Sequence, residues 1–193
     1  MRHYRSDLPK PELVIGLVGP AGTDLTGVST ALLSALKPYD YKTYVIKVSK
    51  LIAEKCSDGV RNELDDCSFE RRVEILQDEG DKFRAHIGYG GALVPLICSR
   101  IRFVRQNFLK EEGCLDDFDE VELYNHCFIV DSIKHPDEIN MLRNIYGEKF
   151  ILISCFSDYE DRRNFLRKEI SKYYKTTRGK SYDDKIDVII ETD

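Results

Sequence analysis

Hydrophobic positions along the chain form short apolar runs separated by longer stretches of helical periodicity. The first run, 13–18, is rich in branched residues, as expected for a strand buried on both faces of a sheet. A turn follows at 19–22 (Gly-Pro-Ala-Gly), and the next stretch has one apolar helical face, made of Leu25, Val28, Leu32, Leu33 and Leu36. The pattern therefore predicts a strand, a tight turn and a helix in direct succession.

Later apolar runs predict further strands at 43–48, 127–131, 150–155 and 186–190. Helices are expected at 49–56, from Ser68 to about His86, from Ala92 to about Lys110, at 136–146 and from Asp158 onward, whereas the polar stretch 57–66 predicts a loop. Strands joined by helices imply right-handed crossovers and a parallel sheet. We predict a three-layer α/β/α fold of the P-loop NTPase class, with a lid-like helical pair inserted at about residues 68–112.

Composition fits one globular domain spanning residues 1–193, with 42% hydrophobic and 33% charged residues. No apolar run approaches the roughly 20 residues of a membrane span. The polar stretch 1–12 lacks the apolar core of a secretory signal, and we expect a loose arm there. The six cysteines include no C-x-x-C pair, so we expect a cytoplasmic protein with no zinc site in this segment.

Charge is unevenly distributed along the chain. The net charge of −5 argues against broad nucleic-acid binding. Residues 111–122 hold seven acids and no base, which is typical of a solvated loop. Residues 162–180 hold eight bases and one acid, and these form either a solvated helix face or a place where anions are held.

The predicted turn resembles the phosphate-binding loop G-x-x-x-x-G-K-[ST], whose main-chain N–H groups and helix N-terminus attract anions. Gly19 fits the first position and Thr26 fits the Mg²⁺-ligating hydroxyl, but Asp24 and Leu25 replace the second glycine and the lysine. Asp24 either caps the helix or puts a carboxylate near the ligand. The candidate phosphate-binding residues are Gly19, Ala21, Gly22, Thr23, Asp24, Leu25 and Thr26.

Asp131 ends the apolar run 127–131, as the Mg²⁺-holding aspartate of a Walker B strand does. We predict that Thr26 and Asp131 hold Mg²⁺ with a nucleoside triphosphate, whether ATP, GTP or a deoxynucleotide. Arg163 and Arg167 lie one helical turn apart and either clamp a phosphate as catalytic cations beside Asp131 or pair with surface acids. On the helix from Ser68, Gln77, Asp81 and Arg84 share a polar face that we expect to contact a second ligand, such as a base or sugar.

Three stretches carry a resemblance to a known family: Ile15 to Leu25, Arg72 to Arg84 with its Leu-Gln-Asp-Glu-Gly-Asp core, and Val130 to Glu138 with its Lys-His-Pro-Asp-Glu run. The chain is similar to the N-terminal P-loop domain of the dCTP/dCMP deaminase-related proteins of bacterial anti-phage defence. More distantly, it looks like nucleoside-monophosphate and dephospho-coenzyme A kinases. The loop without lysine is usual in the first family.

The resemblance implies a nucleotide-binding domain that regulates or assembles a zinc deaminase carried farther along a longer chain. These residues cannot themselves deaminate by that mechanism, because no histidine begins an H-x-E pattern and no P-C-x-x-C occurs. We therefore expect a fragment of a longer protein.

Three functions remain open from the sequence. The first is a regulatory nucleotide-binding domain, and the second is an active nucleotide kinase that transfers the γ-phosphate of ATP to a monophosphate. The third is an interaction domain without a nucleotide, which binds a partner subunit, a second copy of the chain or a regulatory RNA through the basic residues 172–180. No membrane partner is expected.

Overall fold

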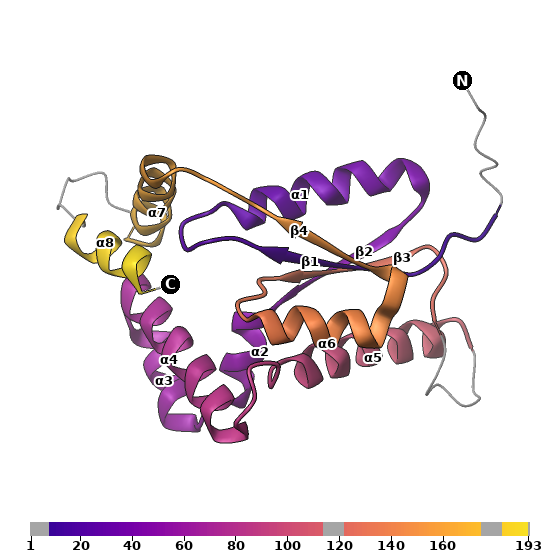
Figure 1. Ribbon diagram of the computed structural model, residues 1–193, viewed down its shortest axis with the longest axis horizontal. Coiled ribbons are helices and arrows are strands. Elements are labelled where there is room, and N and C mark those ends of the chain that lie inside the picture. Colours follow the sequence, from indigo (N-terminus) through magenta and orange to yellow (C-terminus); the bar gives the residue numbers. More distant parts are fainter. Residues whose placement is uncertain (1–7, 114–121, 175–182, 193) are drawn as a thin grey trace.

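A computed structural model describes residues 8–113, 122–174 and 183–192, and it contains a four-stranded parallel sheet (Figure 1). The strand order is β2-β3-β1-β4, in which every neighbouring pair is parallel. The strands are β1 (Leu13–Val18), β2 (Lys42–Lys47), β3 (His126–Asp131) and β4 (Phe150–Ser154). The parallel sheet that we predicted is confirmed.

Helices cover both faces of this sheet, which makes three layers. Alternate residues of a strand point to opposite faces, so Ile15 and Leu17 pack under α1 (Leu25–Leu36), whereas Val14 belongs to the core on the other side. That second core includes residues of α5 (Val94–Glu111) and α6 (Pro136–Tyr146). Figure 1 shows α1 on one side of the sheet and α5 and α6 on the other. The predicted α/β/α architecture is confirmed.

The remaining helices gather beyond the carboxyl ends of the strands. They are α2 (Val48–Lys55), α3 (Asp58–Asp66), α4 (Phe69–Ile87), α7 (Tyr159–Tyr174) and α8 (Asp183–Glu191). Two short 3-10 turns, Lys37–Tyr39 and Gly147–Lys149, lie instead at the amino ends of β2 and β4. Both helices expected at 68–112 are present, as α4 and α5, but only α4 lies beyond the sheet, because α5 packs on the sheet itself. Helix α4 extends away from the sheet and contacts α2, α7 and α8.

Two predicted elements are wrong. The stretch 57–66 is helix α3 rather than a loop, because the Ser57 hydroxyl caps its first turn and Leu64 is buried. The stretch 186–190 is part of helix α8 rather than a strand. Ile186, Ile189 and Ile190 have helical spacing and bury one face against α7.

The prediction of a loose arm over 1–12 does not hold at its end. Residues 1–7 lie outside the described ranges, but Lys10 exchanges two hydrogen bonds with Asn125, and the Pro11 carbonyl accepts from the Tyr41 hydroxyl. Glu12 is 2% exposed and forms an ion pair with Arg105 of α5. The end of the arm is therefore anchored to the sheet and to α5.

A third cluster of buried residues closes the region beside the turn after β1. Leu166 and Ile170 of α7 pack on the isoleucines of α8, and Ala21, Phe69 and Val73 pack against them. The turn after β1 therefore lies under a helical cap made of α4, α7 and α8. Within the described ranges, no helix has the combined length and apolar character needed to cross a bilayer.

Candidate functional site

The predicted phosphate loop connects β1 to α1, and its geometry requires glycine at one position. Gly22 has a φ of +85°, which disfavours any residue with a side chain. A Cβ on Gly22 would also lie 2.8 Å from Arg162 Cβ and 2.9 Å from the Arg162 carbonyl oxygen. Arg162 in turn donates from Nη1 to the Ala21 carbonyl oxygen at 3.3 Å. Helix α7 therefore holds the loop in its observed shape.

Some main-chain donors of the loop are used internally and others are not. The N–H of Thr23 donates to the Pro20 carbonyl at 3.0 Å, and the N–H of Leu25 donates to the Thr23 carbonyl at 2.8 Å. The N–H groups of Gly22, Asp24 and Thr26 take no acceptor from the described part of the chain. The loop thus keeps donors available for an anion at the N-terminus of α1.

Asp24 is a helix cap. Its Oδ1 accepts from the Gly27 N–H at 2.7 Å, and its carbonyl accepts from the Val28 N–H at 3.2 Å. The capping alternative left open by the sequence is therefore the one observed. The carboxylate still adds negative charge beside the loop, so the site needs cations from elsewhere to hold a phosphate.

Leu25, at the position of the usual P-loop lysine, belongs to the core. It is 9% exposed and packs with Ile15, Leu17 and Ile129 under the sheet. Its predicted role in phosphate binding can therefore involve only its main chain, and the Leu25 N–H already donates to Thr23.

A cavity of about 320 Å³ opens beside the loop. On one side it is lined by loop residues, including Gly19, Gly22 and Thr26, and on the other by Val73 of α4 and Phe165 of α7. Its floor is formed by residues at or just beyond the carboxyl ends of β2 and β3: Lys47, Ser49, Asp131, Ser132 and Lys134. Ligands in open α/β sheets bind at this end of the strands, so the cavity is the candidate site.

Two lysines from outside the loop reach this cavity. Lys47 ends β2, and its Nζ donates to Thr26 Oγ1 over 3.4 Å, a long hydrogen bond. Lys134 follows β3, and its Nζ donates to the Gly19 carbonyl oxygen, also over 3.4 Å. Sequence reasoning missed both lysines. Only their positions could have indicated a role in the site. Each lysine comes at or just after the end of a predicted strand, and the carboxyl ends of parallel strands meet at one edge of the sheet.

Asp131 lines the same cavity as these two lysines, and its carboxyl group is influenced by both of their charges. Lys47 and Asp131 are register partners on neighbouring strands. Burial raises the pKa of the Asp131 carboxyl above its usual value, and the charges of Lys47 and Lys134 oppose that rise. With Asp131 ionised, the cavity lining holds two ammonium groups and one carboxylate, a net charge of +1.

The predicted Mg²⁺ ligands were Thr26 and Asp131, and their surroundings do not fit a metal. Mg²⁺ needs an octahedral oxygen shell at about 2.1 Å, but the Thr26 hydroxyl already accepts from Lys47, and the charges of Lys47 and Lys134 both act on the Asp131 carboxyl. A dication about 4 Å from one ammonium is repelled by roughly 8 kcal/mol at an effective dielectric constant of about 20, which cancels its attraction to the single carboxylate at the same distance. Within residues 8–113, 122–174 and 183–192, no three His, Cys, Asp or Glu side chains form a metal cluster.

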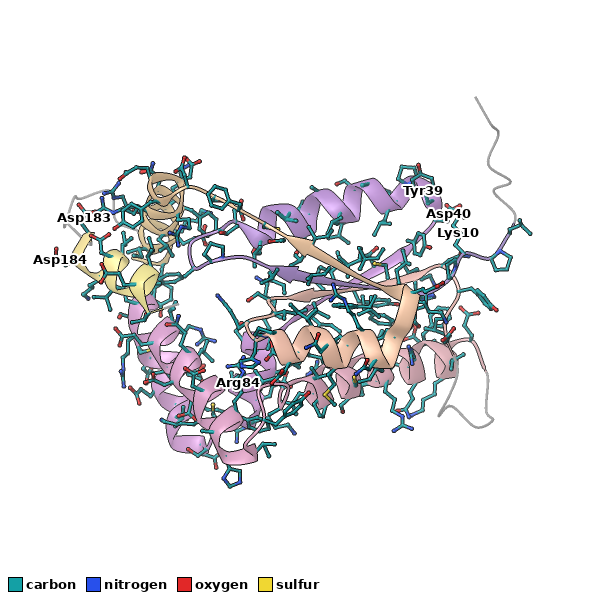
Figure 2. All side chains as sticks on the ribbon, in the orientation of Figure 1. Lys10, Tyr39, Asp40, Arg84, Asp183 and Asp184 are labelled. Atoms are coloured by element: carbon teal, nitrogen blue, oxygen red, sulfur yellow. The ribbon has the colours of Figure 1, made fainter. Side chains whose placement is uncertain are left out.

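The predicted second-ligand residues on α4 do not line the cavity. Arg84 donates from Nη2 to Glu138 Oε1 at 2.8 Å, and Glu138 is 1% exposed. Asp81 pairs with Arg84 on the same helix, and Gln77 is half-buried farther along it. Figure 2 shows Arg84 where α4 approaches the start of α6. Arg84 therefore joins two helices, and a role for Gln77 and Asp81 in binding a base or sugar stays a prediction.

Glu138 connects Arg84 to the candidate site. Its Oε2 accepts from the N–H of Lys134 at 2.9 Å and from the N–H of His135 at 3.2 Å. His135 completes the cap of α6 by accepting from the Asp137 N–H at 3.1 Å. The Lys-His-Pro-Asp-Glu run thus caps a helix and fixes the main chain of Lys134.

Arg163 and Arg167 pair with acids of α8. Arg163 Nε lies 2.8 Å from Asp187 Oδ1, and Arg167 Nη2 lies 2.7 Å from Asp183 Oδ1. Figure 2 shows Asp183 at the corner between α7 and α8, far from Arg84. Neither arginine lines the cavity. Of the two alternatives left open, the observed one is ion pairing, with partners on α8 as well as on α7.

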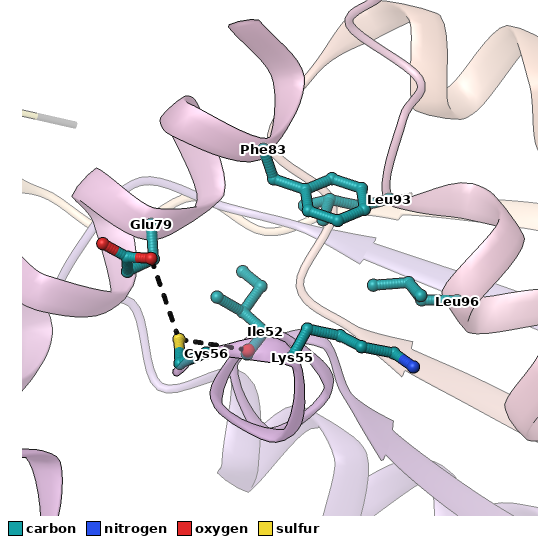
Figure 3. Close-up of a pocket in the computed structure, with 7 residues that line it drawn as sticks. All are labelled: Ile52, Lys55, Cys56, Glu79, Phe83, Leu93 and Leu96. Atoms are coloured by element: carbon teal, nitrogen blue, oxygen red, sulfur yellow. Dashed lines mark hydrogen bonds between the residues drawn. The ribbon is translucent and has the colours of Figure 1, made fainter. Parts of the chain in front are cut away.

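A second, smaller pocket lies between α2, α4 and α5 (Figure 3). Its walls are mostly apolar, with Ile52, Phe83, Leu93 and Leu96 around the Cys56 thiol, which donates to Glu79 Oε2 at 3.9 Å. Its volume of about 30 Å³ holds one or two water molecules rather than a ligand.

The basic stretch expected to bind RNA is described only in part. Residues 175–182 lie outside the described ranges. The Tyr173 hydroxyl donates to the Cys67 carbonyl at 2.7 Å, and its ring packs at an angle on Phe69. Tyr173 therefore joins α7 to the start of α4.

No family model matches the chain, and no curated protein sequence matches it. The candidate site is defined by its geometry alone: a glycine turn, two lysines and one half-buried aspartate around a cavity beneath a helical cap.

Proposed function

We propose that this chain is a nucleotide-binding domain that holds the phosphates of a nucleotide at the loop 19–26. The observation that carries this proposal is the convergence of the loop, Lys47 and Lys134 on one cavity. The chain lacks the P-loop lysine, and these two side chains supply cations at the same place.

Electrostatics favour an anionic ligand. A unit charge on a phosphate about 4 Å from one ammonium gains about 4 kcal/mol at an effective dielectric constant of about 20. Two such contacts offset the repulsion from Asp131 and from the exposed Asp24 cap. The N–H groups of Gly22 and Thr26, which have no acceptor among the described residues, and the N-terminus of α1 add to the attraction.

The far wall of the cavity suits the rest of a nucleotide. Val73 and Phe165 are half-buried and apolar, and the Phe165 ring offers a stacking surface for a base. The volume of about 320 Å³ lies at the small end of the range known for ligand pockets. A nucleotide would therefore place its phosphates on the loop and its base under α4 and α7.

The wider role that we propose follows the family resemblance. The domain would regulate a deoxycytidylate deaminase of anti-phage defence, whose catalytic zinc centre would lie outside these residues, and it would act in the cytoplasm. No contact in the described residues favours the kinase alternative, since Arg163 and Arg167 are paired with Asp183 and Asp187.

Isothermal titration calorimetry with ATP, GTP and deoxynucleoside triphosphates tests the proposal. We expect binding by the wild-type chain and a tenfold to hundredfold loss in Lys134→Ala, because a hydrogen bond to a charged group contributes about 1.5–3 kcal/mol. Lys37→Ala is the matched control, since Lys37 is exposed at the opposite end of α1. The proposal fails if no nucleotide binds, or if the two variants lose affinity equally.

A further inference from the structure

Lys47 lies beside the residues that were expected to hold a magnesium ion. Its ammonium donates to the Thr26 hydroxyl, the first predicted metal ligand, over 3.4 Å. Its strand lies beside the strand of Asp131, the second predicted ligand, and the two residues are paired in register. In-register neighbours on parallel strands project from the same face of a sheet. Lys47 therefore contacts the first predicted ligand, and it shares a face of the sheet with the second, whose carboxylate its charge influences.

An ammonium group matches these surroundings in charge and in hydrogen bonding. It carries three donors and no acceptor, so one lysine can bond to a hydroxyl and a carboxylate and still offer an N–H to a phosphate. A second cation, Lys134, reaches the loop from the Gly19 side. A metal at Thr26 and Asp131 would have to displace Lys47 or remain next to its charge.

We infer that Lys47 takes the place of Mg²⁺, and that the site binds the polyphosphate of a nucleotide without a divalent cation. This inference rests on the proposed function, because it concerns the same cavity and the same ligand. The inference goes beyond the proposed function by specifying the ligand as the free polyphosphate anion rather than its magnesium complex.

The test measures binding of ATP and of inorganic tripolyphosphate to the full chain by calorimetry, once in EDTA and once in excess Mg²⁺. We expect the wild-type dissociation constant in EDTA to be no weaker than in Mg²⁺. Lys47→Ala should lose at least tenfold in affinity in EDTA and recover part of it in Mg²⁺, because Thr26 and Asp131 are then open to a metal. Lys47→Arg should keep binding in EDTA, since it keeps the charge.

Lys50→Ala is the matched control, because Lys50 is an exposed lysine of α2 that does not line the cavity. Circular dichroism spectra and melting temperatures check that each variant is folded. Wild-type binding that requires Mg²⁺ overturns this inference and leaves the proposed function standing, as does a Lys47→Ala variant that keeps full affinity in EDTA. Absence of binding in both buffers overturns the proposed function and this inference with it.

Discussion

Restoring the P-loop lysine by Leu25→Lys provides a sharp test of how this site is built. The substitution brings the sequence closer to G-x-x-x-x-G-K-[ST], so a motif-based argument predicts tighter phosphate binding. The structure predicts the opposite, because Leu25 is 9% exposed and packs against Ile15 and Leu17 under the sheet.

The expected magnitude follows from burial. Burying a leucine side chain contributes about 1.5–3 kcal/mol. A lysine at the N-terminus of α1 can bring its ammonium toward water while its stem stays in the core. In that position the ammonium contacts solvent rather than a phosphate on the loop, because side chain 25 packs under the sheet with Ile15 and Leu17. We therefore expect Leu25→Lys to lower the free energy of unfolding by about 2 kcal/mol and to leave nucleotide affinity unchanged or weaker.

Urea unfolding monitored by circular dichroism, together with calorimetry using ATP, measures both quantities. Leu25→Met is the volume-conserving control and should cost less than about 1.5 kcal/mol. Leu33→Lys is the positional control, because Leu33 is on the same helix but 38% exposed, and it should change stability by less than about 0.5 kcal/mol. A Leu25→Lys protein of normal stability that binds ATP more tightly would refute the reasoning.

Two further predictions concern groups away from the loop. Arg84→Met should lower the free energy of unfolding by about 3 kcal/mol, because the buried Glu138 carboxylate then keeps only main-chain donors. Urea unfolding measures this loss. Arg143→Met is the control and should have little effect, because Arg143 is exposed. An equal effect of the two variants would contradict the assigned pair. Burial raises the pKa of the fully buried Cys127 thiol to about 12, so iodoacetamide at pH 8.5 should label Cys127 only after unfolding, whereas half-exposed Cys67 reacts in the native protein. Mass spectrometry of the labelled peptides decides this, and labelling of native Cys127 would contradict its burial.

The fold could be predicted where the local pattern agrees with the tertiary environment. The apolar run of β1 is buried on both faces, and the apolar face of the helix after it packs on the same sheet. The local sequence pattern and the tertiary packing therefore favour the same structure. The errors occur where a short apolar run fits two structures. The isoleucines of α8 suit a strand by composition, but the spacing of Ile186, Ile189 and Ile190 places all three on one helical face.

The site residues also differ in how far they could be predicted from the sequence. The glycine turn and the Asp24 cap are local in sequence, and each could be predicted from residues beside it. The pairing of Arg163 with Glu160 is also local, but the partners on α8 could not be predicted, because the sequence pattern had suggested a strand rather than a helix at 186–190. Arg84 was assigned to a ligand because a polar helix face gives no sign of the buried carboxylate on α6 that it meets.

The lysines of the cavity show why an incomplete motif does not by itself mean an incomplete site. The P-loop motif specifies a cation next to the loop in sequence. The attraction of a phosphate, however, depends on the distance to the cation and not on the cation's position in the sequence. The strand order β2-β3-β1 brings the ends of β2 and β3 to the loop, so Lys47 and Lys134 can provide that charge. Position 25 is then free to be apolar and to strengthen the core beneath the loop. The main chain of Lys134 is fixed by Glu138, which accepts from its N–H, and Glu138 is in turn paired with Arg84. The cation therefore depends on α6, which begins two residues after it, and on Arg84 of α4, which lies 54 residues before Glu138, so only the folded chain brings them together.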